Sequence, residues 1–166
     1  MDYLYHGTSV QNGIKIAKAG AILSPFEQTL RDWQNLLRQN PNNPFFKERS
    51  VEELALDSIR RRFGEHEIEC RGKSVSLVTN LGMAGHYALR FDSTKGGIVL
   101  GFSRDFHQLR ELGASGNKQN IYIPSQFPLD ALVEIYLSPK AILSQRAIKE
   151  AFAKYNPRYS YIPPIR

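Results

Sequence analysis

The residues best suited to chemistry near the start of the chain are His6, Gly7 and Thr8, which end a short extended pattern. An imidazole, a hydroxyl and a glycine that lets a ligand approach the backbone closely together suit a binding cleft. Each residue also has a structural interpretation. A histidine can hold a hydrogen bond, and Thr8 or Ser9 can cap a helix that begins at Val10. The motif therefore predicts either a ligand site or a structural turn.

A second unusual residue is Glu134, a carboxylate in the middle of an apolar strand pattern at 132–137. Alternation of side chains predicts that Val133, Ile135 and Leu137 face the core. The other face then carries Leu132, Glu134 and Tyr136. A glutamate in mid-strand is costly to desolvate unless a cation or hydrogen-bond donors meet it. It is either a surface or salt-bridged group, or an acid held for catalysis.

The elements that must position these residues alternate between strand and helix patterns. Strands are expected at 3–6, 21–23, 75–79, 97–102, 120–123 and 132–137, and helices at 10–19, 82–90 and 140–154. Residues 26–64 differ, because apolar residues recur there at helical spacing and Ser50 with Glu53 forms a capping box. The pattern predicts one α+β domain over 1–166, with an antiparallel or split sheet, flanking helices, a helical insertion near 26–64 and a polar, aromatic tail at 155–166.

The composition limits the classes of partner and compartment. The formal net charge of +6 at pH 7 favours nucleic acids or anionic small molecules as ligands. The single cysteine excludes an intramolecular disulfide and fits the cytoplasm, either of the producing cell or of a host. No apolar run is long enough to span a membrane, so no membrane partner is expected.

A metal site is not expected either. Metal-binding residue types gather in one short segment, which contains Glu65, His66, Glu67, Glu69 and Cys70. Their crowded spacing matches no familiar pattern of metal ligands. A solvated approach to the next strand is the better interpretation of this segment.

Taken in order, three segments resemble motifs of the ADP-ribosyltransferase superfamily. They are His6-Gly7-Thr8, the segment from Gly72 to Tyr87, and the strand that carries Glu134. The resemblance is closest to the poly(ADP-ribose) polymerase and diphtheria-toxin branch, which has a His-Tyr-Glu triad. Two positions diverge from that branch. The triad tyrosine falls on Ser76, and the serine that bonds the nicotinamide amide falls on Ala84.

The resemblance implies a split antiparallel sheet and NAD as the substrate that donates ADP-ribose, without a metal. Glu134 and His6 would be the catalytic residues: the carboxylate would stabilise an oxocarbenium-like ribose, and the histidine would hold a ribose hydroxyl. The NAD-binding residues implied by the resemblance are His6, Gly7, Thr8, Ser76 and Tyr87.

The function implied is mono-ADP-ribosyl transfer to a nucleic acid or a protein, by a toxin, effector or defence factor that an antitoxin or immunity protein could accompany. Basic residues of the loop that follows the strand at 97–102 would bind the acceptor, namely Arg104, Arg110 and Lys118. Three alternatives remain open. The chain could be a catalytically inactive relative, a basic nucleic-acid-binding module, or an RNA 2′-phosphotransferase, which shares the fold.

Overall fold

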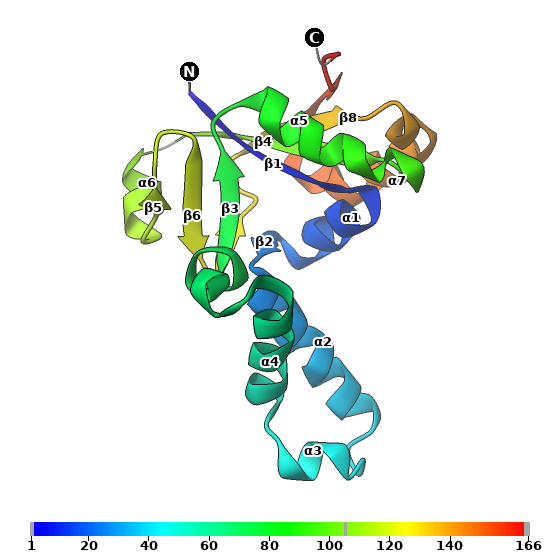
Figure 1. The fold of residues 1–166 in the computed structure, drawn as a ribbon. Helices are drawn as coiled ribbons and strands as arrows, with labels where there is room; N and C mark the ends of the chain where they lie inside the picture. Colours follow the sequence, from blue (N-terminus) through cyan, green and yellow to red (C-terminus); the bar gives the residue numbers. More distant parts are fainter. Residues whose placement is uncertain (1, 105, 165–166) are drawn as a thin grey trace.

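The computed structural model describes residues 2–104 and 106–164 (Figure 1). Over these residues, seven strands form one sheet in the order β5-β6-β3-β1-β4-β8-β9. They are β1 Tyr3–Ser9, β3 Ser74–Val78, β4 Gly97–Ser103, β5 Ser115–Gly116, β6 Asn120–Pro124, β8 Leu132–Leu137 and β9 Arg158–Tyr161. A separate two-stranded sheet pairs β2 Ala21–Leu23 with β7 Gln126–Pro128. Neighbouring strands are antiparallel except β8 and β9, which are parallel.

The described chain contains seven α-helices. They are α1 Val10–Ala19, α2 Pro25–Gln39, α3 Phe45–Glu48, α4 Val51–Phe63, α5 Leu81–Leu89, α6 Phe106–Glu111 and α7 Gln145–Phe152. Residues of α1 and α7 belong to the main core with one face of the sheet, whereas α5 packs on the other face. None of the described helices combines the length and apolar character needed to cross a membrane. The predicted α+β fold is confirmed.

The sheet is split between β1 and β3. In the described chain these strands pair only where Tyr5 faces Val78, although β1 pairs with β4, and β3 with β6, along their lengths. Past Tyr5, the side chain of His6 crosses the gap, with Nδ1 3.0 Å from the carbonyl oxygen of Ser76. A carbonyl can only accept, so Nδ1 carries the proton. The strands diverge beyond this contact, which opens a cleft between them.

Two glycines let α5 lie directly on the sheet. A Cβ atom at Gly7 would lie 2.3 Å from the carbonyl oxygen of Ala84, and one at Gly97 would lie 2.0 Å from that of Ala88. Ala84 and Ala88 form a small buried cluster with Val99. Gly7 is therefore required for helix packing, whatever it also does for a ligand.

The helical insertion forms an arm of α2, α3 and α4 that extends away from the sheet (Figure 1). The predicted capping box is confirmed: Ser50 Oγ accepts from the backbone of Glu53, and the Glu53 carboxylate accepts from the backbone of Ser50. At the far end, the rings of Trp33 and Phe45 stack with centroids 5.8 Å apart, and Phe46 packs edge-on against both. The arm thus has its own small aromatic cluster.

The predicted core face of β8 needs one correction. Ladder pairs join Glu134 to Gly101 and Leu132 to Phe102, which leaves Val133 as an extra residue in a β-bulge. The bulge turns Leu132 into the core and leaves Val133 partly exposed, which is the reverse of simple alternation. Ile135 and Leu137 are buried as predicted.

The C-terminal segment is more ordered than the predicted extended tail. Part of it forms β9, which lies beside β8 and pairs Arg158 with Glu134. Residues 165–166 of the predicted tail lie outside the described chain. The short elements α6, β5 and β7 were also absent from the sequence-based expectation.

The packing of α5 predicts the effect of Gly7→Ala. The new methyl group would meet the backbone of α5, so we expect the free energy of unfolding to fall by about 1–3 kcal/mol in denaturant titration. Gly101→Ala in the neighbouring strand is the matched control, because its Cβ would meet nothing closer than 3.4 Å. Its change should stay within about 0.5 kcal/mol. Equal effects for the two variants would contradict this packing.

Candidate active site

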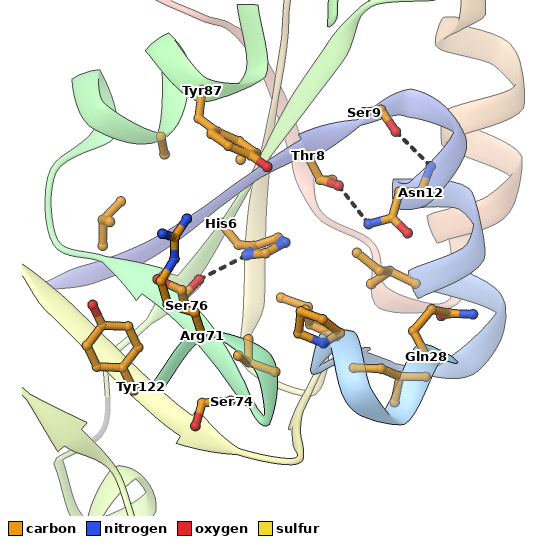
Figure 2. A pocket seen from close by; sticks show the side chains of 18 of the residues that line it. His6, Thr8, Ser9, Asn12, Gln28, Arg71, Ser74, Ser76, Tyr87 and Tyr122 are labelled. Atoms are coloured by element: carbon orange, nitrogen blue, oxygen red, sulfur yellow. Dashed lines mark hydrogen bonds between the residues drawn. The ribbon is translucent and has the colours of Figure 1, made fainter. Parts of the chain in front are cut away.

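A cleft of about 750 Å³ occupies the split between β1 and β3 (Figure 2). Its walls come from β1, β2, β3 and β6, from α1 and α5, and from α2, α4 and the segment that returns from the arm. The volume lies within the range of small-molecule and cofactor sites. Five residues that the sequence predicted for NAD binding line it together: His6, Gly7, Thr8, Ser76 and Tyr87.

His6 lies half-buried in the cleft wall, between the two halves of the sheet. Burial lowers the pKa of its imidazole, and the hydrogen bond to Ser76 offsets this only in part. The ring is therefore neutral at pH 7, with a proton on Nδ1 and an acceptor at Nε2. It can accept a hydrogen bond from a ligand hydroxyl without carrying charge.

The hydroxyl groups after Gly7 are fixed by the start of α1. Ser9 is the N-cap and accepts from the backbone N–H of Asn12 at 3.1 Å. The side chain of Asn12 donates to Thr8 Oγ1 at 2.8 Å, which leaves the Thr8 hydroxyl proton able to donate. Asn12 also lines the cleft, and sequence reasoning missed it. The sequence signal for Asn12 is its position four residues after Thr8, since side chains one helical turn apart can contact each other.

Aromatic rings stand on two sides of the cleft. Tyr87 on α5 is 45% exposed, and its ring packs edge-on against Phe91 with centroids 5.8 Å apart. On the sheet, Ser76 lies directly opposite Tyr122 of β6, and both line the cleft. A tyrosine ring therefore stands beside the position where the resembled family carries its triad tyrosine, although on the next strand.

The structure does not bring Glu134 to the cleft. It lies on β8, separated from β1 by β4, and it is not among the cleft-lining residues described. Its carboxylate accepts from Ser160 Oγ at 2.6 Å and from the Tyr136 hydroxyl at 2.9 Å, and the Arg158 guanidinium lies 3.6 Å away. Burial and the bond to Glu134 raise the pKa of Tyr136. This geometry ties the C-terminal strand to β8, and a catalytic role for Glu134 stays a prediction.

The charged side chains that do line the described cleft are Asp32, Arg62 and Arg71, besides the neutral His6. Asp32 lies on α2 and accepts a hydrogen bond from Gln28 Nε2 at 3.1 Å, which leaves its other oxygen available. All three come from the arm or from the segment that returns from it. Within the described residues, no three His, Cys, Asp or Glu side chains gather closely enough to hold a metal ion.

The predicted acceptor-binding residues lie away from the cleft wall. Arg104 follows β4, where its backbone N–H bonds to the carbonyl of Asp2 at 2.9 Å. Arg110 is exposed on α6. Lys118 lies in the turn between β5 and β6, where its carbonyl accepts from the Thr79 hydroxyl at 2.9 Å. Their role in binding an acceptor stays a prediction.

The lowered pKa of His6 predicts a pH-dependent stability. Below about pH 6.5 the unfolded chain binds more protons at this residue than the folded one, so stability present at higher pH is lost as the pH falls. The variant His6→Asn keeps a donor for the Ser76 carbonyl but does not titrate in this range. As the pH falls, the free energy of unfolding of the wild type should decrease by up to about 1.4 kcal/mol more per pH unit than that of the variant. Denaturant titrations between pH 7.5 and 5.5 measure this, and parallel profiles for the two proteins would refute it.

The bonds of Glu134 predict a structural cost for its removal. Glu134→Leu leaves the hydroxyls of Ser160 and Tyr136 without their acceptor, so we expect a loss of about 1–3 kcal/mol in the free energy of unfolding. Glu150→Leu is the control, because that glutamate is exposed and its ion pair in the described chain is a surface pair with Arg146. If Glu134→Leu is as stable as the wild type, Glu134 does not hold the C-terminal strand.

The chain is similar in structure to DarT of Thermus sp. 2.9. With DarT in complex with ADP-ribosylated ssDNA the TM-score is 0.54 at 12% identity, covering 96% of this chain and 93% of that one. With DarT in complex with NAD+ the TM-score is 0.52 at 12% identity, and the match covers 96% of this chain and 94% of that one. With DarT in complex with carba-NAD+ the TM-score is 0.50 at 13% identity, and the match covers 96% of this chain and 95% of that one.

No protein-family model matches the sequence, and a search of curated proteins finds no significant match. At these identities the structural similarity concerns the fold, and the poly(ADP-ribose) polymerase and diphtheria-toxin branch stays a prediction. The cleft between β1 and β3 thus belongs to a chain with the ADP-ribosyltransferase fold seen in DarT.

Proposed function

We propose that the protein binds NAD in the cleft between β1 and β3 and transfers its ADP-ribose to single-stranded nucleic acid. The observation that carries this proposal is the meeting of His6, Gly7, Thr8, Ser76 and Tyr87 on one cleft. Their chemistry suits NAD. A flat ring can lie against Tyr87, a ribose hydroxyl can donate to His6, and the Thr8 hydroxyl can donate to an oxygen of the ligand.

Transfer breaks the bond between nicotinamide and ribose C1′, and the bonding electrons leave with the nicotinamide. The ribose becomes oxocarbenium-like until a nucleophile of the acceptor bonds to C1′ and loses a proton. A carboxylate about 4 Å from this cation, at an effective dielectric constant near 20, contributes on the order of 4 kcal/mol, or roughly a thousandfold in rate. Asp32 is the carboxylate that lines the described cleft, so we assign it this role in preference to Glu134.

The choice of nucleic acid as acceptor rests on charge and on similarity. The chain carries a net charge of +6, and Arg110 and Lys118 are exposed beside the short strands β5 and β6. A similar solved structure is described as a complex with ADP-ribosylated ssDNA. Modification of nucleic acid would suit a toxin, effector or defence factor, which an antitoxin or immunity protein could restrain.

A second candidate is a relative that binds NAD without cleaving it. The observation that favours it is the position of Glu134, which is bonded on three sides outside the cleft. This candidate shares the binding cleft with the transferase and differs from it only in turnover.

Incubation with adenine-labelled NAD and single-stranded DNA, RNA or protein separates the candidates. For the transferase, we expect label on nucleic acid and released nicotinamide. Asp32→Asn should lower the rate by about a thousandfold with KM little changed, because the charge acts on the transition state. Asp130→Asn, an exposed aspartate away from the cleft, is the matched control.

Each other outcome has a defined meaning. Saturable NAD binding without release of nicotinamide supports the non-cleaving relative. Full activity of Asp32→Asn with loss of activity in Glu134→Gln, under conditions where both remain folded, would return the catalytic role to Glu134. Failure of the wild type to bind NAD at all would overturn both candidates.

A further inference from the structure

We propose that Arg62, Phe63 and Arg71 form an anion site on the arm side of the cleft, which binds the pyrophosphate of a dinucleotide. The identification of the anion as part of NAD rests on the proposed function. The site itself rests on the geometry of these three side chains, all of which line the cleft.

The chain brings the two arginines to one aromatic ring. Helix α4 ends at Phe63, and Gly64 adopts φ +75° and turns the chain back through short helical turns at Glu65–Glu67 and Ile68–Gly72. The returning segment packs closely on the helix, because a Cβ at Gly72 would lie 2.4 Å from the Ile59 side chain. This return places Arg71 beside Phe63, although they are separated in sequence.

The ring holds both guanidinium groups at the cleft wall. The Cζ atom of Arg62 lies 4.8 Å from the centroid of the Phe63 ring, and that of Arg71 lies 5.5 Å away. Both distances are within the range of cation–π contacts. In Figure 2, the Arg71 guanidinium lies on the same side of the cleft as Ser76 and Tyr122. A planar guanidinium offers paired N–H donors that match phosphate oxygens.

The charge balance leaves this cluster positive. Arg71 is paired with Glu67 at 2.7 Å, whereas Arg62 forms no ion pair with a carboxylate of the described chain. Among the described residues that line the cleft, Asp32 is the one acidic residue, and it lies on α2. The two guanidinium groups beside the Phe63 ring and the one carboxylate paired with them carry a net charge of +1, which favours an anion.

Arginines in the last turn of α4 also have a structural interpretation, because cations there offset the helix dipole. Arg60 already fulfils that role, with Nε 3.2 Å from Glu65 and Nη1 3.9 Å from Asp57. Arg61 is exposed and does not line the cleft. Arg62 differs from Arg60 and Arg61 because it lies on the cleft wall. The helix dipole does not explain this position. The helical arm is then a functional wall of the site.

Isothermal titration with ADP, inorganic pyrophosphate and adenosine tests the proposal without any turnover. Arg62→Gln and Arg71→Gln should each weaken ADP and pyrophosphate binding by about tenfold, and the double variant by more, with adenosine binding unchanged. Arg61→Gln is the matched control, and it should stay within about twofold of the wild type. Phe63→Leu should weaken ADP binding as well, because it removes the ring that orients both guanidinium groups. Thermal unfolding confirms that each variant is folded.

A folded double variant that binds ADP within twofold of the wild type would overturn the anion site, as would a wild type that binds neither ADP nor pyrophosphate. These results are separable from the proposed function. ADP binding that depends on Arg62 and Arg71, in a protein that transfers no ADP-ribose, would leave the anion site standing and remove the transferase. If the double variant transfers ADP-ribose with an unchanged KM for NAD, the transferase stands and the anion site is removed.

Discussion

The hydrogen bond from His6 to the Ser76 carbonyl is the contact on which the cleft depends. Strands β1 and β3 share one ladder position, at Tyr5 and Val78, and a continued ladder would close the space that a ligand needs. The imidazole replaces the missing backbone bond across the gap, with Nδ1 3.0 Å from the carbonyl oxygen. His6 therefore keeps the two halves of the sheet together while they separate. A structural and a ligand-binding role for this residue are compatible, because its Nε2 remains free of this bond.

The two carboxylates considered for catalysis illustrate different constraints. Glu134 stands in a strand where three donors satisfy it, so its burial is stabilised by the C-terminal strand that pairs with β8. Asp32 is exposed on the arm, and within the described chain its carboxylate accepts one hydrogen bond, from Gln28. A carboxylate that already has several protein partners has few lone pairs left for a substrate. Availability, as well as residue type, therefore decides which acid can serve a reaction.

Much of the sheet could be predicted from the sequence, because local patterns specify it. The bounds of α1 and β8 and the capping box at Ser50 follow from spacing within a few residues. The bulge at Val133 could not be predicted, since it depends on the register with β4. The clustering of the His6 motif with Tyr87 followed from the family resemblance. Asp32, Arg62 and Arg71 were missed because they reach the cleft only through the packing of the arm against the sheet, which no local pattern encodes.

The most direct test of the central claim, that the split between β1 and β3 is the NAD site, is a crystal structure of the protein with NAD or a non-cleavable analogue. We expect a ligand in the cleft, with its nicotinamide between Gly7 and Tyr87 and its phosphates facing Arg62 and Arg71. A ligand bound against Glu134 on the far side of β4, or a cleft that stays empty at saturating ligand, would contradict it.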